Sequence, residues 1–112
     1  MSDVAAIPRV GQIGTGFTAI VDEPDPNTPG SFIVVDLTDA DAANCWIEFR
    51  RPDNTTFRKL ATVLGDPTLG KLRYVDSVGI FDMPDTWWFR AVAGFDDGTE
   101  FPGSWYEQPV GI

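Results

Sequence analysis

Two half-apolar runs joined by a tight polar turn make up the stretch TWWFRAVAGFDDGTEFPGSWYE, residues 86–107. In the first run, residues 86–95, side chains alternate between two faces at a period of two, which is typical of a β-strand. Asp97-Gly98 suits the turn, because glycine has no Cβ to clash at positive φ. Residues 43–63 repeat the arrangement around Pro52-Asp53-Asn54-Thr55. The two units predict antiparallel strand pairs.

The rest of the chain follows the same pattern of short strands and turns. Apolar or alternating runs at 17–21, 31–35 and 71–76 predict further strands, and no stretch has a sustained helical period. Strands at short spacing with turn signals between them indicate a β-sandwich. A chain of 112 residues is long enough to bury one core without a metal or a disulfide.

We expect a single domain over residues 17–112, preceded by an N-terminal arm or irregular first strand over residues 1–16. Three prolines between residues 22 and 31 predict an irregular Pro-rich loop there, since proline lacks an amide donor. Residues 36–42 are rich in turn formers and are expected to allow a short helical turn. Residues 65–70 are expected to form a loop.

The charge of the chain excludes several kinds of partner. Its net charge is −9, and such a surface repels both nucleic-acid phosphates and anionic membranes. No apolar run approaches the roughly twenty residues that span a bilayer. The first residues lack the basic and apolar regions of a signal peptide, so we expect synthesis in the cytoplasm.

Catalytic residue types are scarce. The chain has no histidine, which removes the commonest general base and zinc ligand, and one cysteine, Cys45, which the alternation places among core residues. The run from Gly11 to Gly16 precedes a strand instead of a helix, so it does not fit a phosphate-binding loop. Nothing brings Glu48, Glu100 or Glu107 together as a catalytic pair. We predict a non-enzymatic protein without a cofactor.

The acidic loops raise the question of calcium binding. Aspartates near residues 22–25, 36–41 and 96–97 offer oxygen ligands, but none has the spacing of an EF-hand. Aspartates that form turns explain the same pattern. No metal site is predicted.

The aromatic residues exceed what one core needs. Trp87 and Trp88 are neighbours on one predicted strand and must point to opposite faces. Protein interfaces concentrate Trp, Tyr and Arg. We therefore predict a protein–protein contact on the outer face, whose members are Trp46, Trp88, Arg90, Trp105 and Tyr106. The alternative is that the arm or the Pro-rich loop of the same chain covers this face.

Ordered motifs over residues 34–108 resemble a known family. They are Asp36-Leu37-Thr38, the run IEFRRPDNTT at 47–56, LRYV at 72–75, DTWWFRA at 85–91 and DDGT at 96–99. This pattern resembles the immunoglobulin-like virion proteins of tailed bacteriophages, in particular the N-terminal domain of baseplate upper proteins. Asn54 and Asp85 stand where the family pattern has glycine, and the Pro-rich segment 24–30 is an insertion.

The resemblance implies an immunoglobulin-like antiparallel β-sandwich of about seven strands that is a structural component of a bacteriophage particle. Its partners would be other virion proteins and copies of itself. A tail or baseplate position follows from the resemblance, and a capsid-surface or neck position suits a small acidic sandwich as well. The alternative function is a carbohydrate- or receptor-binding module, because sandwiches with exposed tryptophans and acids can bind glycans.

Overall fold

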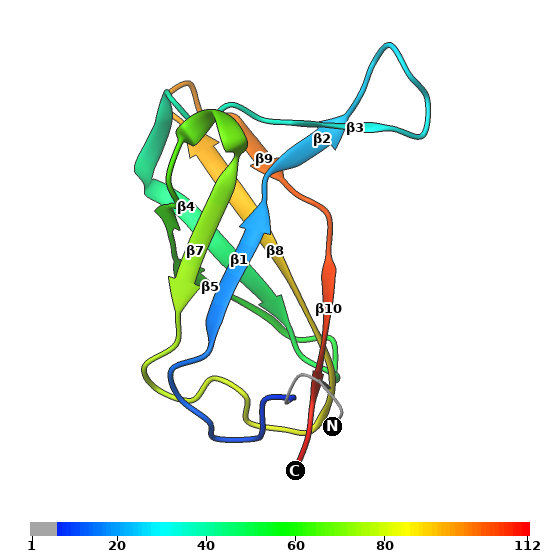
Figure 1. The fold of residues 1–112 in the computed structure, drawn as a ribbon, viewed down its shortest axis with the longest axis vertical. Helices are drawn as coiled ribbons and strands as arrows, with labels where there is room; N and C mark the ends of the chain where they lie inside the picture. The colour runs from blue at the N-terminus through cyan, green and yellow to red at the C-terminus, as the bar shows by residue number, and fades with distance from the viewer. Residues whose placement is uncertain (1–6) are drawn as a thin grey trace, which may run out of the picture.

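A computed structural model describes residues 7–112, which form a β-sandwich with a projecting hairpin (Figure 1). The strands are β1 (Gly16–Ile20), β2 (Asp22–Pro24), β3 (Phe32–Val34), β4 (Ala40–Arg50), β5 (Thr56–Leu60), β6 (Thr62–Val63), β7 (Lys71–Val75), β8 (Asp85–Phe95), β9 (Glu100–Pro102) and β10 (Tyr106–Val110). A single 3-10 helix, η1 (Pro67–Leu69), is the only helix in this part of the chain. It is too short to cross a membrane. The all-β fold predicted from the sequence is confirmed.

The sandwich has two antiparallel layers. One sheet has the order β1-β7-β6, and the other has the order β10-β8-β4-β5 with β9 also paired to β8. These are the B-E-D and G-F-C-C′ orders of the immunoglobulin fold. The described residues form ten strands instead of about seven, because β2, β3 and β9 are additional segments of three residues each.

The core lies between the layers and is built on aromatic rings. Phe17 of β1 contacts Phe49, Phe81 and Phe89 edge to face, with ring centroids 4.9 to 5.6 Å apart. Trp87 is fully buried, and its indole Nε1 donates a 3.0 Å hydrogen bond to the Met83 carbonyl. The alternation of β8 thus buries Trp87 and turns Trp88 outward.

The segment expected to be an irregular loop, 22–31, begins with a strand. Asp22–Pro24 pairs with Phe32–Val34 to form a two-stranded hairpin that projects from one end of the sandwich (Figure 1). Pro24 is tolerated because it lies at the end of a ribbon with free edges. The prolines at 26 and 29 fall in the connection, where no ladder hydrogen bond is lost.

Two local expectations are wrong. Residues 36–42 form no helical turn, because β4 begins at Ala40, which pairs with Phe95. The helical turn lies instead at Pro67–Leu69, in the expected loop. Asp66 caps it by accepting from the Thr68 amide, and Pro67 fits the first helical position.

The described part of the predicted arm lies against the domain, while residues 1–6 are outside the described residues. Arg9 pairs in parallel with Gly111, and the Gly14 amide donates a 2.7 Å hydrogen bond to the Asp76 carbonyl. Asp76 is itself fully buried. Its carboxylate accepts from the amides of Val78, Gly79 and Ile80 at 2.8 to 3.1 Å. This carboxylate holds the loop that receives the arm.

Candidate interaction surface

The outer face of the five-stranded sheet carries most of the predicted site residues. We use the name "outer face" for Trp46, Glu48, Arg50, Arg58, Trp88, Arg90, Glu100 and Trp105. Register places Glu48 of β4 between Arg58 of β5 and Arg90 of β8, and Arg50 opposite Trp88. Residues on directly paired positions share one face of a sheet, so these side chains meet.

An ion network runs across this face. Glu48 is only 9% exposed and accepts from Arg90 at 2.6 Å and from Arg58 at 3.1 Å. Arg58 also holds Glu100 through two hydrogen bonds, at 2.9 and 3.1 Å. The hydrogen bond from Arg58 lowers the pKa of Glu100, and the same contact raises the pKa of Arg58. Paired hydrogen bonds from one guanidinium fix orientation as well as distance.

Beside the ion network, two arginines stack on two indoles. The guanidinium carbon of Arg90 lies 4.4 Å from the ring centroid of Trp105. Arg50 lies between Trp105 and Trp88, at 5.0 and 5.3 Å. The Nε of Arg50 is buried and makes no hydrogen bond to the described residues. The guanidinium of Arg50 therefore interacts mainly with the two indole rings. Cation–π attraction of this kind contributes about 0.5–2 kcal/mol.

The structure brings three of the five predicted residues together: Trp88, Arg90 and Trp105 are joined through Arg50 or by direct contact. Trp46 shares the face and is half-buried, beside the exposed Leu60 with which it is paired. Tyr106 does not join this group. Its ring stacks on Phe89 at 5.4 Å, on the core side of the sheet edge, because consecutive residues of a strand alternate.

The sequence does not predict four members of the outer face: Glu48 as a buried acid, and Arg50, Arg58 and Glu100. Arg50 alternates with Glu48 along one strand, which was a usable signal that the two share a face. The partners on β5 and β8 depend on cross-strand register, which the local sequence does not contain.

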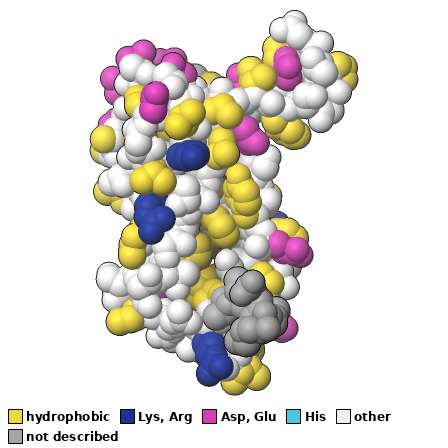
Figure 2. Space-filling model, viewed as in Figure 1, with side chains coloured by type: hydrophobic (Ala, Val, Ile, Leu, Met, Phe, Trp, Pro, Cys, Tyr) yellow, Lys and Arg dark blue, Asp and Glu magenta, His cyan; other side chains and the backbone are white. Residues whose placement is uncertain are grey.

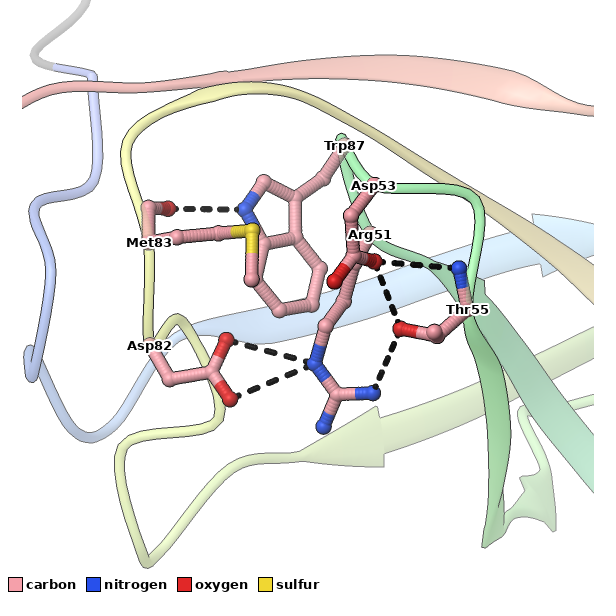
Figure 3. A network of polar contacts seen from close by, with 6 residues as sticks. All are labelled: Arg51, Asp53, Thr55, Asp82, Met83 and Trp87. Carbon is pink, nitrogen blue, oxygen red and sulfur yellow. Dashed lines mark hydrogen bonds and ion pairs between the residues drawn. The ribbon is translucent and has the colours of Figure 1, made fainter.

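A second polar cluster closes one end of the sandwich (Figure 3). Arg51 donates from Nε to both carboxylate oxygens of Asp82 at 3.2 Å and from Nη1 to Thr55 at 3.2 Å. Its guanidinium also lies 4.4 Å from the ring centroid of Phe57. The residue joins the turn after β4 to the loop before β8. Its contacts are internal, which indicates a structural role.

Four of the acidic turns share one hydrogen-bonding motif. Asp36, Asp53, Asp66 and Asp97 each accept hydrogen bonds from the backbone amide and hydroxyl of a threonine two residues later. These hydrogen bonds lower the pKa of each carboxyl group, because they stabilise its charged form. The carboxylates that suggested calcium in the sequence thus serve as turn caps at Asp36 and Asp97.

Within residues 7–112, no group of three or more acidic or cysteine side chains is placed to hold a metal, and no pocket is present. Cys45 is buried, as predicted, and burial raises the pKa of its thiol. Comparison of the chain with protein-family models, with curated proteins and with solved structures finds no match.

Proposed function

We propose that the chain is a non-enzymatic structural component of a bacteriophage particle, which docks onto other virion proteins through the outer face. The resemblance of its turn and strand motifs to immunoglobulin-like virion proteins motivates the proposal. The position on the particle, whether tail, baseplate, neck or capsid surface, is left open by the proposal.

The observation that carries the proposal is the backbone at two turn positions. Asn54 and Asp85 are the two non-glycine residues with positive φ in the described part of the chain, at 70° and 97°. Both stand where the family pattern has glycine, the residue that adopts positive φ without strain. Positive φ at these two positions supports the proposed resemblance, because glycine at the same places of the family pattern would meet the same backbone conformation.

The composition of the outer face supports docking to protein. Tryptophan and arginine dominate it, and both are enriched at the energetic centres of interfaces. Glu48 orders Arg58 and Arg90, and cation–π contacts order the rings of Trp88 and Trp105, so less conformational entropy is lost when a partner binds. For the carbohydrate-binding alternative, a sugar needs a free ring face, and Arg50 already lies over the rings of Trp88 and Trp105.

Co-sedimentation with particles tests the proposal. Particles are purified from a lysate of the host in which the encoding genome is expressed, and mass spectrometry is expected to find the chain in them. Purified chain is then added to particles that lack it. Trp88→Ala is expected to reduce rebinding about tenfold or more, as at interface hot spots. Val78→Ala, at a 69% exposed residue in the loop that follows β7, serves as the matched control.

Two results would overturn the proposal. One is the absence of the chain from purified particles. The other is unchanged rebinding of Trp88→Ala when urea unfolding shows that the variant is folded, which would remove the outer face from the docking role. Saturable binding of a glycan on an array, with no binding to particles, would favour the carbohydrate-binding alternative.

A further inference from the structure

The β2–β3 hairpin (residues 22–34) presents apolar side chains to solvent. Phe32, Ile33 and Val34 are 58%, 40% and 48% exposed, on consecutive positions of a three-residue strand. Because consecutive residues alternate, Ile33 lies on one face of the ribbon and Phe32 and Val34 lie on the other. An isolated two-stranded hairpin is only marginally stable in water, and monomers seldom leave such residues uncovered. These properties indicate that another surface covers the hairpin.

The base of the hairpin is fixed to the sandwich. Asp22 accepts hydrogen bonds from the amide and the hydroxyl of Ser104 at 2.8 to 3.2 Å. The Val35 amide donates to the Val21 carbonyl at 2.9 Å, and the Asp25 amide donates to the Ser31 carbonyl at 2.8 Å. The projection is thus ordered before any partner binds, which lowers the entropy lost on association.

All charges on the hairpin have one sign. Asp22, Glu23 and Asp25 are its only ionisable residues. Glu23 pairs with Ile33 across the ribbon, so a carboxylate and an exposed apolar side chain share one face. The complementary surface must therefore be apolar with positive charge.

The chain itself carries such a surface on the outside of the sheet β1-β7-β6. We use the name "basic face" for Ile20, Leu64, Lys71, Arg73 and Val75. Lys71 and Arg73 are alternate residues of β7, and pairing places Ile20 and Leu64 on either side of Lys71. No acidic residue lies at an outward position of these three strands. Neither cation takes part in an ion pair of the described residues.

The hairpin and the basic face carry charges of opposite sign. Figure 2 shows basic side chains amid hydrophobic ones over the front sheet, while acidic side chains gather at the upper end and on the hairpin. On a chain with a net charge of −9, a patch with two cations and no carboxylate is a local exception.

We propose that the β2–β3 hairpin of one copy docks on the basic face of a second copy. The inference deepens the proposed function by naming a second copy of this chain as a partner. Ile33 would contact Leu64 and Val75, while Glu23 and Asp25, on the same face of the ribbon as Ile33, would face Lys71 and Arg73. Because the two patches differ, the contact is heterologous, and repetition generates a ring or an open filament.

A symmetric hairpin-to-hairpin contact is disfavoured by the same charges. It would bring Glu23 and Asp25 of two copies together, and like charges at a contact oppose association. The head-to-tail arrangement places opposite charges together at each contact. It also leaves the outer face of the other sheet free for a different protein.

Analytical ultracentrifugation of the purified chain tests the contact. Wild type is expected to sediment as a concentration-dependent series of oligomers that shifts toward monomer as salt rises, since screening weakens exposed charge pairs. Ile33→Asp and the double variant Lys71→Glu/Arg73→Glu are each expected to weaken association about tenfold or more. Leu60→Asp is the matched control, because Leu60 is 55% exposed but lies on the other sheet.

Mixing the two defective proteins gives the decisive result. Ile33→Asp retains a working basic face, and Lys71→Glu/Arg73→Glu retains a working hairpin. Together they are expected to form a one-to-one dimer and nothing larger, which only a heterologous contact explains. Circular dichroism checks that each variant is folded.

Three outcomes would overturn the inference: a wild-type chain that stays monomeric at high concentration, a mixture that stays monomeric, or equal weakening by Leu60→Asp. Capture of the hairpin by a different basic protein, with no self-association, would overturn it as well. These measurements use the purified chain alone. The inference can therefore fail while the chain is still found in phage particles, and the reverse also holds.

Discussion

Glu48 and Arg90 are cross-strand neighbours near the middle of the five-stranded sheet, and their side chains form a 2.6 Å ion pair on the outer face. The carboxylate is nearly buried and also holds Arg58, so one acid organises two arginines. Loss of the acid would leave Arg90 without a carboxylate partner in the described structure. The outer face thus depends on a residue that a binding partner would hardly touch.

Glu48→Ala is expected to lower the free energy of unfolding by about 2–3 kcal/mol, because removal of the carboxylate leaves the partly buried guanidinium groups of Arg58 and Arg90 without this partner. Urea unfolding at pH 7 measures the change. Glu107→Ala, at an exposed acid on β10 outside the ion pairs of the described residues, should change stability by less than about 0.5 kcal/mol. Equal effects of the two variants would contradict the role given to Glu48.

Asp76→Ala is expected to destabilise the domain by about 3 kcal/mol, because three loop amides lose their acceptor in a buried site. Amide hydrogen exchange should accelerate most at Val78, Gly79 and Ile80. Asp25→Ala removes a partly buried aspartate that accepts from one amide, that of Asn27, and supplies the control. Unchanged exchange at the three loop amides would show that the carboxylate does not hold this loop.

Asn54→Gly and Asp85→Gly are each expected to raise the free energy of unfolding by about 0.5–1 kcal/mol, because glycine relieves the strain of positive φ. Neither side chain makes a hydrogen bond within the described residues. Ala43→Gly, within a strand at ordinary φ, should instead destabilise by a similar amount. Thermal unfolding of the three variants compares them directly, and destabilisation by Asp85→Gly would contradict the strain argument.

Acid is expected to weaken the fold through the Asp-x-Thr turns. The pKa values of Asp36, Asp53, Asp66 and Asp97 lie below the ordinary 3.8 in the folded protein. Their stabilisation is therefore complete above that value and is lost as pH falls through the lower folded pKa. Urea midpoints should decline as the pH falls below about 4.

Variants that alter one Asp-x-Thr turn at a time provide the control for the pH effect. Thr55→Val and Thr99→Val remove the hydroxyl that donates to Asp53 and Asp97. Each should raise the pKa of its own aspartate toward the ordinary value in an NMR titration and leave the other aspartate unchanged. A shift of both aspartates by one variant would point to a global change instead.

Cys45 is expected not to react with a thiol reagent in the folded protein, because it is buried and its pKa is raised by that burial. Ellman's reagent should label it at the rate at which the domain unfolds. Labelling of the folded chain within seconds, in the absence of denaturant, would contradict the placement of this residue in the core.

The sequence predicted the features that depend on local pattern. Alternation placed Trp87 inside and Trp88 outside, and turn residues marked the connections after β4 and β8. Alternation also separates Trp105 from Tyr106, although both were assigned to one surface. The pairing of Asp22–Pro24 with Phe32–Val34 was not predicted, because proline content argued for irregular backbone. Contacts such as Arg50 with Trp105 arise from register between distant strands, which no local pattern contains.

The arrangement of the indoles has an optical consequence. Trp87 is enclosed in the core, whereas Trp88 and Trp105 lie half-covered beside arginines on the outer face, and Trp46 lies half-buried on the same face. A partner that covers this face would shift the emission of three fluorophores while the fourth keeps its spectrum. Intrinsic tryptophan fluorescence can therefore report whether a partner covers the outer face, and the emission of Trp87 serves as the internal reference.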